Sequence, residues 1–194
     1  MGGHVIIFYT IFFLKYTYFK FISFTNTLKT PSSIFVAGHR GMVGSAIVRL
    51  LEKIVDVTII KRTRQQLDLR NEKDVIDFSP DYLFHLGAFT SLEYCELNKD
   101  DTFITNTLSV ENATHISNKL NIPILYISSA GIFDGKKDFY DDWDIPNPMG
   151  NYARSKYLGE LFVQNNNSKH LICRAGWMMG GGPKKDKKFI QKIM

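Results

Sequence analysis

Residues 38–44 read Gly38-His39-Arg40-Gly41-Met42-Val43-Gly44, and they stand between an apolar run at 34–37 and an amphipathic stretch at 44–53. In such a strand–turn–helix unit the first glycine allows a tight turn, the second lets backbone amides approach a phosphate, and the third lets the helix pack against the strand. The helix N-terminus adds free amides and a partial positive charge. The spacing therefore predicts a turn that binds the pyrophosphate of a dinucleotide, through Gly38, Arg40, Gly41, Met42, Val43 and Gly44.

The rest of the chain alternates short apolar runs with helical patterns. Strands are expected at 34–37, 57–60, 82–86, 122–127 and 171–175, and helices at 44–53, 74–78, 101–120 and 151–165. No internal repeat or low-complexity linker interrupts this order. The pattern predicts an α/β protein with a Rossmann-type doubly wound parallel sheet and helices on both faces, over residues 32–183.

The composition limits the classes of protein and partner. The chain of 194 residues is 44% hydrophobic, which is enough for one sizeable core. Its net charge is +5, but the first 31 residues contribute three lysines and no acid, so the remainder carries only +2. We therefore expect no nucleic-acid partner. Cys95 and Cys173 lack the close spacing of a zinc or dithiol motif, so they are expected to be buried thiols of a cytoplasmic protein without a metal site.

Residues 1–31 have a different character from the rest. Residues 5–24 are crowded with Phe, Tyr and Ile but contain Lys15 and Lys20. The uninterrupted apolar run at 5–14 is about half of the ~20 residues that a membrane-spanning helix needs. No basic region precedes it and no Ala-x-Ala-like cleavage site follows it. We expect an extension outside the fold, with an early start codon or a membrane-surface role of residues 5–24 as alternatives.

The segment after the second strand bears on the choice of cofactor. It reads Lys61-Arg62-Thr63-Arg64, where an acidic residue would bind the 2′-hydroxyl of NAD and an arginine would accept the 2′-phosphate of NADP. Arg40 in the glycine turn adds another guanidinium, and this group suits phosphate. NADP(H) is thus the preferred cofactor and NAD(H) the alternative, while a solvated basic turn is the competing interpretation.

Tyr152 and Lys156 form a Tyr-x-x-x-Lys motif, whose spacing places both side chains on one face of a helix. A nearby ammonium is expected to lower the pKa of the phenol, and Lys156 could also hold the nicotinamide ribose. Ser128 and Ser129 end the strand at 122–127, at the edge where open α/β sheets bind ligands. A hydroxyl there can donate to a carbonyl oxygen that gains charge as hydride arrives. Alone the pair would read as a helix surface; with the serine and the glycine turn it predicts a reductase site.

Together these motifs resemble the extended short-chain dehydrogenases/reductases, from about Ser33 to the C-terminus. Residues 34–47 followed by Arg62-Thr63-Arg64 look like GDP-L-fucose synthase. From Pro80 onward the chain is similar to dTDP-4-dehydrorhamnose reductase, through residues 128–135, 146–148, 152–156 and 174–177. Both families reduce the 4-keto group of a nucleotide-linked deoxysugar with NAD(P)H.

The resemblance implies roles by position. Ser129 corresponds to the catalytic Ser/Thr, Tyr152 to the proton donor and Lys156 to the ribose-binding lysine. Substrate contacts are implied at Ser129 and Trp177, and cofactor contacts at Arg40, Arg62, Arg64, Asp68, Leu69, Ala88, Thr90, Asn106, Tyr152 and Lys156. For Asp68 a helix cap is the alternative interpretation. Gly131 stands where fucose synthase has an epimerising cysteine and the rhamnose enzyme a tyrosine, which argues against epimerisation.

These observations predict an oxidoreductase, an NAD(P)H-dependent reductase of a nucleotide-linked 4-keto-6-deoxysugar such as that of dTDP-rhamnose biosynthesis. The resembled families continue into a smaller substrate-binding domain, which would be mostly missing here, with residues 184–194 as the start of its first helix. Two alternatives stay open: a non-catalytic NADP-binding regulatory subunit or inactive fragment, and a nucleotide-sugar epimerase or dehydratase. A homodimer is also left open.

Overall fold

The computed structural model describes residues 4–8, 28–29, 31–54, 56–63, 65–66, 68–69 and 79–178. Six strands form one sheet in the order β1-β6-β5-β4-β2-β3, and every neighbouring pair is parallel. The strands are β1 (His4–Phe8), β2 (Ser32–Ala37), β3 (Val57–Ile60), β4 (Tyr82–His85), β5 (Ile124–Ser129) and β6 (His170–Ala175).

The strand order fixes where a ligand site can lie. From β2 the chain moves outward to β3, and then returns past β2 to form β4 on its other side. The direction of winding therefore reverses between β2 and β4. In open α/β sheets ligands bind at such a switch point, beyond the carboxyl ends of the strands.

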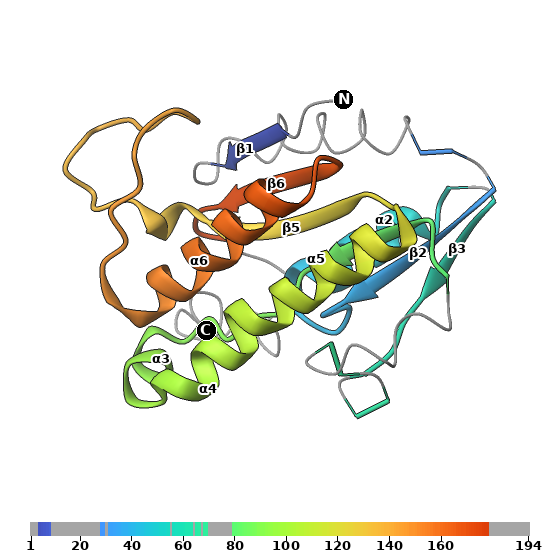
Figure 1. The fold of residues 1–194 in the computed structure, drawn as a ribbon, viewed down its shortest axis with the longest axis horizontal. Coiled ribbons are helices and arrows are strands. Elements are labelled where there is room, and N and C mark those ends of the chain that lie inside the picture. Colours follow the sequence, from blue (N-terminus) through green and yellow to red (C-terminus); the bar gives the residue numbers. More distant parts are fainter. Residues whose placement is uncertain are drawn as a thin grey trace, which may run out of the picture.

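Helices cover both faces of this sheet (Figure 1). Alternate residues of β2 point to opposite faces of the sheet. Ile34 and Val36 pack with α2 (Met42–Leu51), whereas Phe35 and Ala37 pack with α5 (Ser109–Leu120). This alternation confirms the doubly wound parallel sheet predicted from the sequence. The helices are α2 (Met42–Leu51), α3 (Leu92–Leu97), α4 (Lys99–Phe103), the π-helical turn η4 (Ile104–Leu108), α5 (Ser109–Leu120), the short 3-10 turn η5 (Ala130–Ile132) and α6 (Gly150–Asn166).

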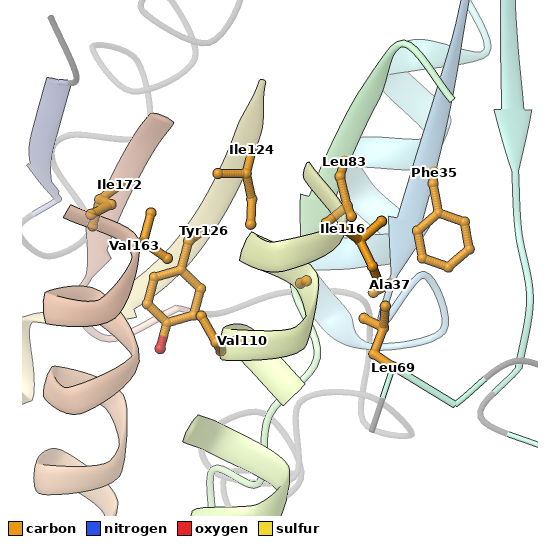
Figure 2. Packing of buried hydrophobic residues seen from close by; sticks show 11 residues of the cluster. Phe35, Ala37, Leu69, Leu83, Val110, Ile116, Ile124, Tyr126, Val163 and Ile172 are labelled. Atoms are coloured by element: carbon orange, nitrogen blue, oxygen red, sulfur yellow. The ribbon is translucent and has the colours of Figure 1, made fainter. Parts of the chain in front are cut away.

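The core beneath α5 and α6 reaches across the sheet from β2 to β6 (Figure 2). Val110 of α5 and Val163 of α6 lie over the ring of Tyr126, which is fully buried. The Tyr126 hydroxyl donates to the backbone carbonyl of Lys156 at 3.1 Å. This buried hydrogen bond links α6 to the central strand β5, and it helps to fix the distance between β5 and the helix that carries the Tyr-x-x-x-Lys motif.

Several element boundaries differ from the expected ones. The helix expected at 101–120 begins earlier and is interrupted by the π-helical turn η4, and the strand expected at 122–127 begins at Ile124 and reaches Ser129. Helix α3 was not expected from the sequence, although Ser91 caps it by accepting a hydrogen bond from the Tyr94 amide at 3.3 Å. The helix expected at 74–78 lies outside the described residues.

Part of the N-terminal segment packs on the sheet, which differs from the expectation that residues 1–31 lie outside the fold. Residues 4–8 pair with β6 as the edge strand β1, and Leu28 is buried with α2 and β2. The backbone of β6 would otherwise present unpaired polar groups at that edge, which favours a further strand. Residues 9–27 lie outside the described residues, and in the described part of the chain no helix is long and apolar enough to cross a membrane.

Candidate cofactor and catalytic site

A cavity of about 820 Å³ opens beyond the carboxyl ends of β2 and β4, at the switch point of the sheet. The glycine turn borders one side and the loop after β4 borders the other. Its lining residues are Phe35, Ala37, Gly38, His39, Arg40, Arg62, Thr63, Gln65, Asp68, Leu69, His85, Gly87, Ala88, Phe89, Thr105 and Ser109. Six of the sequence-predicted cofactor residues are therefore brought to one cavity: Gly38, Arg40, Arg62, Asp68, Leu69 and Ala88.

The turn between β2 and α2 requires glycine at two positions. Gly38 has a positive φ of 81°, and a Cβ atom there would lie 2.5 Å from the backbone nitrogen of Gly87. A Cβ atom on Gly44 would lie 2.1 Å from the carbonyl oxygen of Gly38. The Gly41 amide donates to that same oxygen at 3.0 Å, and Gly41 is the N-cap of α2. Glycine is required at Gly38 and Gly44 because the backbones of the turn, of α2 and of the loop after β4 are in contact and leave no space for a side chain.

The basic residues after β3 separate into two groups. The Lys61 ammonium lies 3.0 Å from a Glu52 carboxylate oxygen at the surface, whereas Arg62 and Arg40 line the cavity. Arg40 and Arg62 therefore line the same cavity as Gly38, and Arg62 Nη1 donates to the Lys61 carbonyl at 3.0 Å. Arg64, the other predicted phosphate contact, lies outside the described residues.

Asn106 is fully buried in η4 and holds the loop after β4 in place. Its side-chain oxygen accepts from the Phe89 amide at 2.8 Å, and its side-chain nitrogen donates to the Phe89 carbonyl at 3.0 Å and to Ser155 Oγ at 3.1 Å. A π-helical turn often marks a functional position. Here it places one amide group between the cavity and α6. Ala88 and Thr90 belong to the loop that Asn106 fixes, although Thr90 does not line the cavity.

Ser129 and Tyr152 come together at the end of β5. Ser129 Oγ accepts from the Gly131 amide at 3.0 Å, and a hydrogen bond from its hydroxyl favours the ionised form of Tyr152. Burial of the phenol is the larger effect, however, and it raises the pKa of Tyr152 above its usual value. The Tyr152 hydroxyl is therefore a protonated group at neutral pH.

Lys156 lies one turn further along α6, and only 3% of its surface is exposed. Its ammonium nitrogen stands 4.3 Å from the centre of the Tyr126 ring. Burial lowers the pKa of Lys156 to about 7, and the charge of Glu160 opposes this shift. The expectation that Lys156 lowers the pKa of Tyr152 is wrong for this structure, because the Tyr152 pKa is raised and the ammonium faces another ring.

Comparison with known proteins identifies the family of the chain. A family model described as "RmlD substrate binding domain" matches residues 32–194. This chain belongs to that family.

Three relatives of this RmlD-family chain carry the name dTDP-4-dehydrorhamnose reductase. A dTDP-4-dehydrorhamnose reductase structure from Yersinia enterocolitica is 36% identical with a TM-score of 0.76, over 84% of this chain and 58% of that one. The same enzyme from Bacillus anthracis, solved in complex with NADP, is 25% identical with a TM-score of 0.72, over 79% and 56%. A curated dTDP-4-dehydrorhamnose reductase from Sinorhizobium fredii is 26% identical over 82% of this chain and 54% of its own length. The chain spans about half the length of the curated relatives it matches.

Ten of the sixteen lining residues of this RmlD-family site were not predicted from the sequence, and His85 and Gly87 are two of them. His85 ends β4, and its Nε2 lies 3.1 Å from Ser109 Oγ. Complete burial lowers the pKa of His85 to about 3, so the ring is neutral. A lone histidine inside an apolar strand was the available signal. Gly87 follows β4 and accommodates the Gly38 turn; a glycine directly after a strand was the signal there.

The remaining predicted residues lie apart from the cavity lining. Met42 and Val43 form the first turn of α2, next to Gly41. Trp177 follows β6 with 67% of its surface exposed. Within the described residues no group of acidic, histidine and cysteine side chains could hold a metal ion. Cys95 and Cys173 are buried free thiols, as expected.

Proposed function

We propose that this chain carries the NADP(H)-binding half of a reductase that acts on the 4-keto group of a nucleotide-linked 6-deoxysugar. The observation that carries the proposal is that one cavity is lined by Gly38 at the start of the glycine turn together with Arg40 and Arg62. The absence of room for a Cβ atom at Gly44 holds the N-terminus of α2 close to the turn, and the free amides of a helix N-terminus suit a pyrophosphate. The NADP complex of the Bacillus anthracis relative supports the same cofactor.

The preference for NADP(H) over NAD(H) rests on charge. The 2′-phosphate of NADP needs cationic donors, and Arg40 and Arg62 are placed to supply them. Asp68 also lines the cavity, six positions after Arg62. We assign Asp68 and Leu69 to the adenine, as the family resemblance implies, rather than to the 2′-phosphate. We propose Arg64 as a further contact to the phosphate.

The chemistry assigned to this chain is proton transfer and alignment. When bound, NADPH supplies a hydride to the carbonyl carbon of the sugar. Tyr152 gives its phenolic proton to the carbonyl oxygen, which becomes the new hydroxyl group, and it regains a proton from solvent. The raised pKa of Tyr152 keeps that proton in place until the oxygen gains negative charge. Ser129 donates to the same oxygen, and Lys156 holds the nicotinamide ribose.

The substrate side is less complete within the described residues. Trp177 stands exposed after β6, which suits a residue that contacts a sugar nucleotide from outside the cofactor cavity. A deoxysugar on a nucleoside diphosphate is the substrate class that the relatives' names support. The two free thiols suit a cytoplasmic protein.

The test uses the full purified chain. NADPH binding is measured by fluorescence, and NADPH oxidation is followed with dTDP-4-keto-6-deoxymannose and with its GDP counterpart. We expect binding, and oxidation with one of these sugars that falls by roughly 100-fold or more in Tyr152→Phe while NADPH affinity is unchanged. Binding without any turnover would favour a regulatory subunit over the reductase. Absence of binding would remove the cofactor assignment itself.

A further inference from the structure

Ser155 lies in α6 between the two residues of the Tyr-x-x-x-Lys motif, and none of its surface is exposed. Its hydroxyl group donates to the backbone carbonyl of Tyr152 at 2.8 Å and accepts from Asn106 Nδ2 at 3.1 Å. Its own backbone carbonyl accepts from the Thr107 hydroxyl at 2.9 Å. Ser155 therefore joins α6 to the π-helical turn η4 through both its side chain and its backbone.

The direction of each hydrogen bond around Ser155 is fixed by the atoms that take part. A backbone amide can only donate, so the Phe89 amide requires the side-chain oxygen of Asn106, at 2.8 Å. The two protons of the Asn106 side-chain nitrogen then have two acceptors, which are the Phe89 carbonyl at 3.0 Å and Ser155 Oγ. The single proton of the Ser155 hydroxyl goes to the Tyr152 carbonyl. Each proton has one acceptor, so each group depends on its neighbour.

These hydrogen bonds connect the cofactor cavity with the proposed proton donor. At one end Phe89 lines the cavity, next to Ala88 in the loop after β4. At the other end the accepting carbonyl belongs to Tyr152. Asn106 and Ser155 are both fully buried, so the loss of one partner would leave a polar group unsatisfied in the core. Two side chains in series therefore set the spacing between the loop and α6.

Close packing limits the movement of α6 in the other direction. A Cβ atom on Gly159, one turn after Ser155, would lie 2.9 Å from the Tyr126 hydroxyl oxygen and 3.2 Å from the Asn106 carbonyl oxygen. The helix thus has little room to move toward η4 and β5. The hydrogen bonds of Ser155 oppose a movement away from η4. The position of α6 is consequently fixed from both directions.

We propose that Ser155 is a positioning residue for the proposed reaction. It holds the loop at Phe89 and the proton donor Tyr152 at one spacing, so that cofactor and phenol meet the carbonyl group of the sugar in one arrangement. Ser155 does not line the cavity, and it acts through Asn106 and through the backbone of Tyr152. The proposal rests on the proposed function, because the roles of the loop and of Tyr152 belong to it.

The first experiment needs no cofactor and measures amide hydrogen exchange by NMR in the wild-type chain and in Ser155→Ala. The variant leaves one proton of Asn106 without its acceptor, so the Phe89 amide should lose part of its protection and exchange roughly tenfold faster. The Leu83 amide, which donates to the Pro123 carbonyl at 3.0 Å in the sheet, reports opening of the whole fold and should change far less. Unchanged exchange at Phe89 would overturn the proposal, whether or not NADPH binds.

Ser117 of α5 supplies the matched control. It is also a fully buried serine, which donates to the Ile122 carbonyl and accepts from Asn167 Nδ2 at 2.9 Å, and it does not line the cavity. Ser117→Ala removes the same two kinds of hydrogen bond and should lower the midpoint of urea unfolding by a similar amount, but leave the Phe89 amide protected. Equally faster exchange at Phe89 in both variants would mean a general loss of stability, and the proposal would be wrong.

The second experiment applies the same two variants to the reaction. Ser155→Ala should lower kcat by roughly tenfold or more and leave KM for the sugar unchanged, because misalignment of the proton donor affects the chemical step. NADPH should also bind more weakly, because the loop that lines the cavity is less ordered. Ser117→Ala should change none of these quantities. A wild-type kcat in Ser155→Ala would contradict a positioning role. If the wild-type chain does not bind NADPH, the proposed function fails, whereas the exchange measurement still decides the coupling between the loop and Ser155.

Discussion

The two sides of the proposed site are built by different physics. On the side of β2 and α2, the geometry is set by backbone contacts at Gly38 and Gly44, and the cationic groups line an open cavity. On the side of β5 and α6, ionisable side chains are buried beside one another, and the ion pair of Glu160 and Arg174 lies in the core. The structure of the β2–α2 side depends on glycines that have no side chain, whereas the structure of the β5–α6 side depends on the mutual compensation of buried charges.

This contrast indicates how each side should fail. A glycine turn fails sterically, and the damage is independent of pH. A buried network fails electrostatically, so its failures depend on which partner remains and on proton concentration. The following changes test that division, beginning with the largest expected effect.

Arg174→Met should break the buried side most severely. It leaves the carboxylate of Glu160 without its partner in a region that excludes water, and breaking such a pair typically costs about 3–5 kcal/mol. The free energy of unfolding in urea measures this loss. The double variant Glu160→Leu with Arg174→Met is the matched control, because it removes both charges and should recover most of the stability. A single variant that loses less than about 1 kcal/mol would contradict the charge-compensation view.

Gly44→Ala should break the open side through crowding alone. The new methyl group would start 2.1 Å from the Gly38 carbonyl oxygen, so α2 must move away from the turn. Inserting a methyl group into a packed site typically costs about 1–3 kcal/mol. Gly87→Ala is the matched control in the same contact region, since a Cβ atom there would lie 3.7 Å from its nearest neighbour. Equal destabilisation by the two changes would argue against a steric requirement at Gly44.

The sequence predicted the open side well, and the reason is physical. The turn needs glycine at fixed spacings whatever surrounds it, so Gly38, Gly41 and Gly44 can be recognised from the sequence alone. The parallel sheet was legible for a similar reason, because its buried strands read as apolar runs. The spacing of Tyr152 and Lys156 also predicted that both lie on one helix, which is α6.

The β5–α6 side was harder to predict from the sequence because the pKa values and contacts of its side chains depend on how deeply they are buried. Nothing in the Tyr-x-x-x-Lys spacing indicates that the ammonium of Lys156 would lie over Tyr126 rather than act on Tyr152. The pairing of Glu160 with Arg174 joins residues on two different elements, and His85 gave only a weak signal within an apolar strand. The edge strand β1 was missed because its pairing with β6 spans almost the whole described chain.

Arg62→Ala sharpens the comparison within the open side. Removal of one charge-assisted hydrogen bond to a phosphate should weaken NADPH binding by roughly tenfold or more and leave NADH binding almost unchanged. The neighbouring Lys61→Ala supplies the control, because Lys61 pairs with Glu52 at the surface and should affect neither cofactor. Fluorescence titration with both cofactors measures the ratio. Equal weakening of NADPH and NADH would mean that Arg62 does not read the 2′-phosphate.

The smallest expected effect is a pH dependence that only the buried side should show. The pKa of Lys156 is about 7 in the folded chain and near 10.5 when unfolded, so between these values the unfolded chain binds the extra proton. Stability should therefore rise with pH above about 7, by at most about 1.4 kcal/mol per pH unit. Urea unfolding at pH 7 and pH 8 measures this slope, and Lys156→Met should reduce it. The range stops below pH 9 because burial also raises the pKa values of Cys173 and Tyr152, and those groups oppose the rise at higher pH. A slope that persisted in Lys156→Met would mean that another group carries the linkage, and that burial does not set the proton affinity of this lysine.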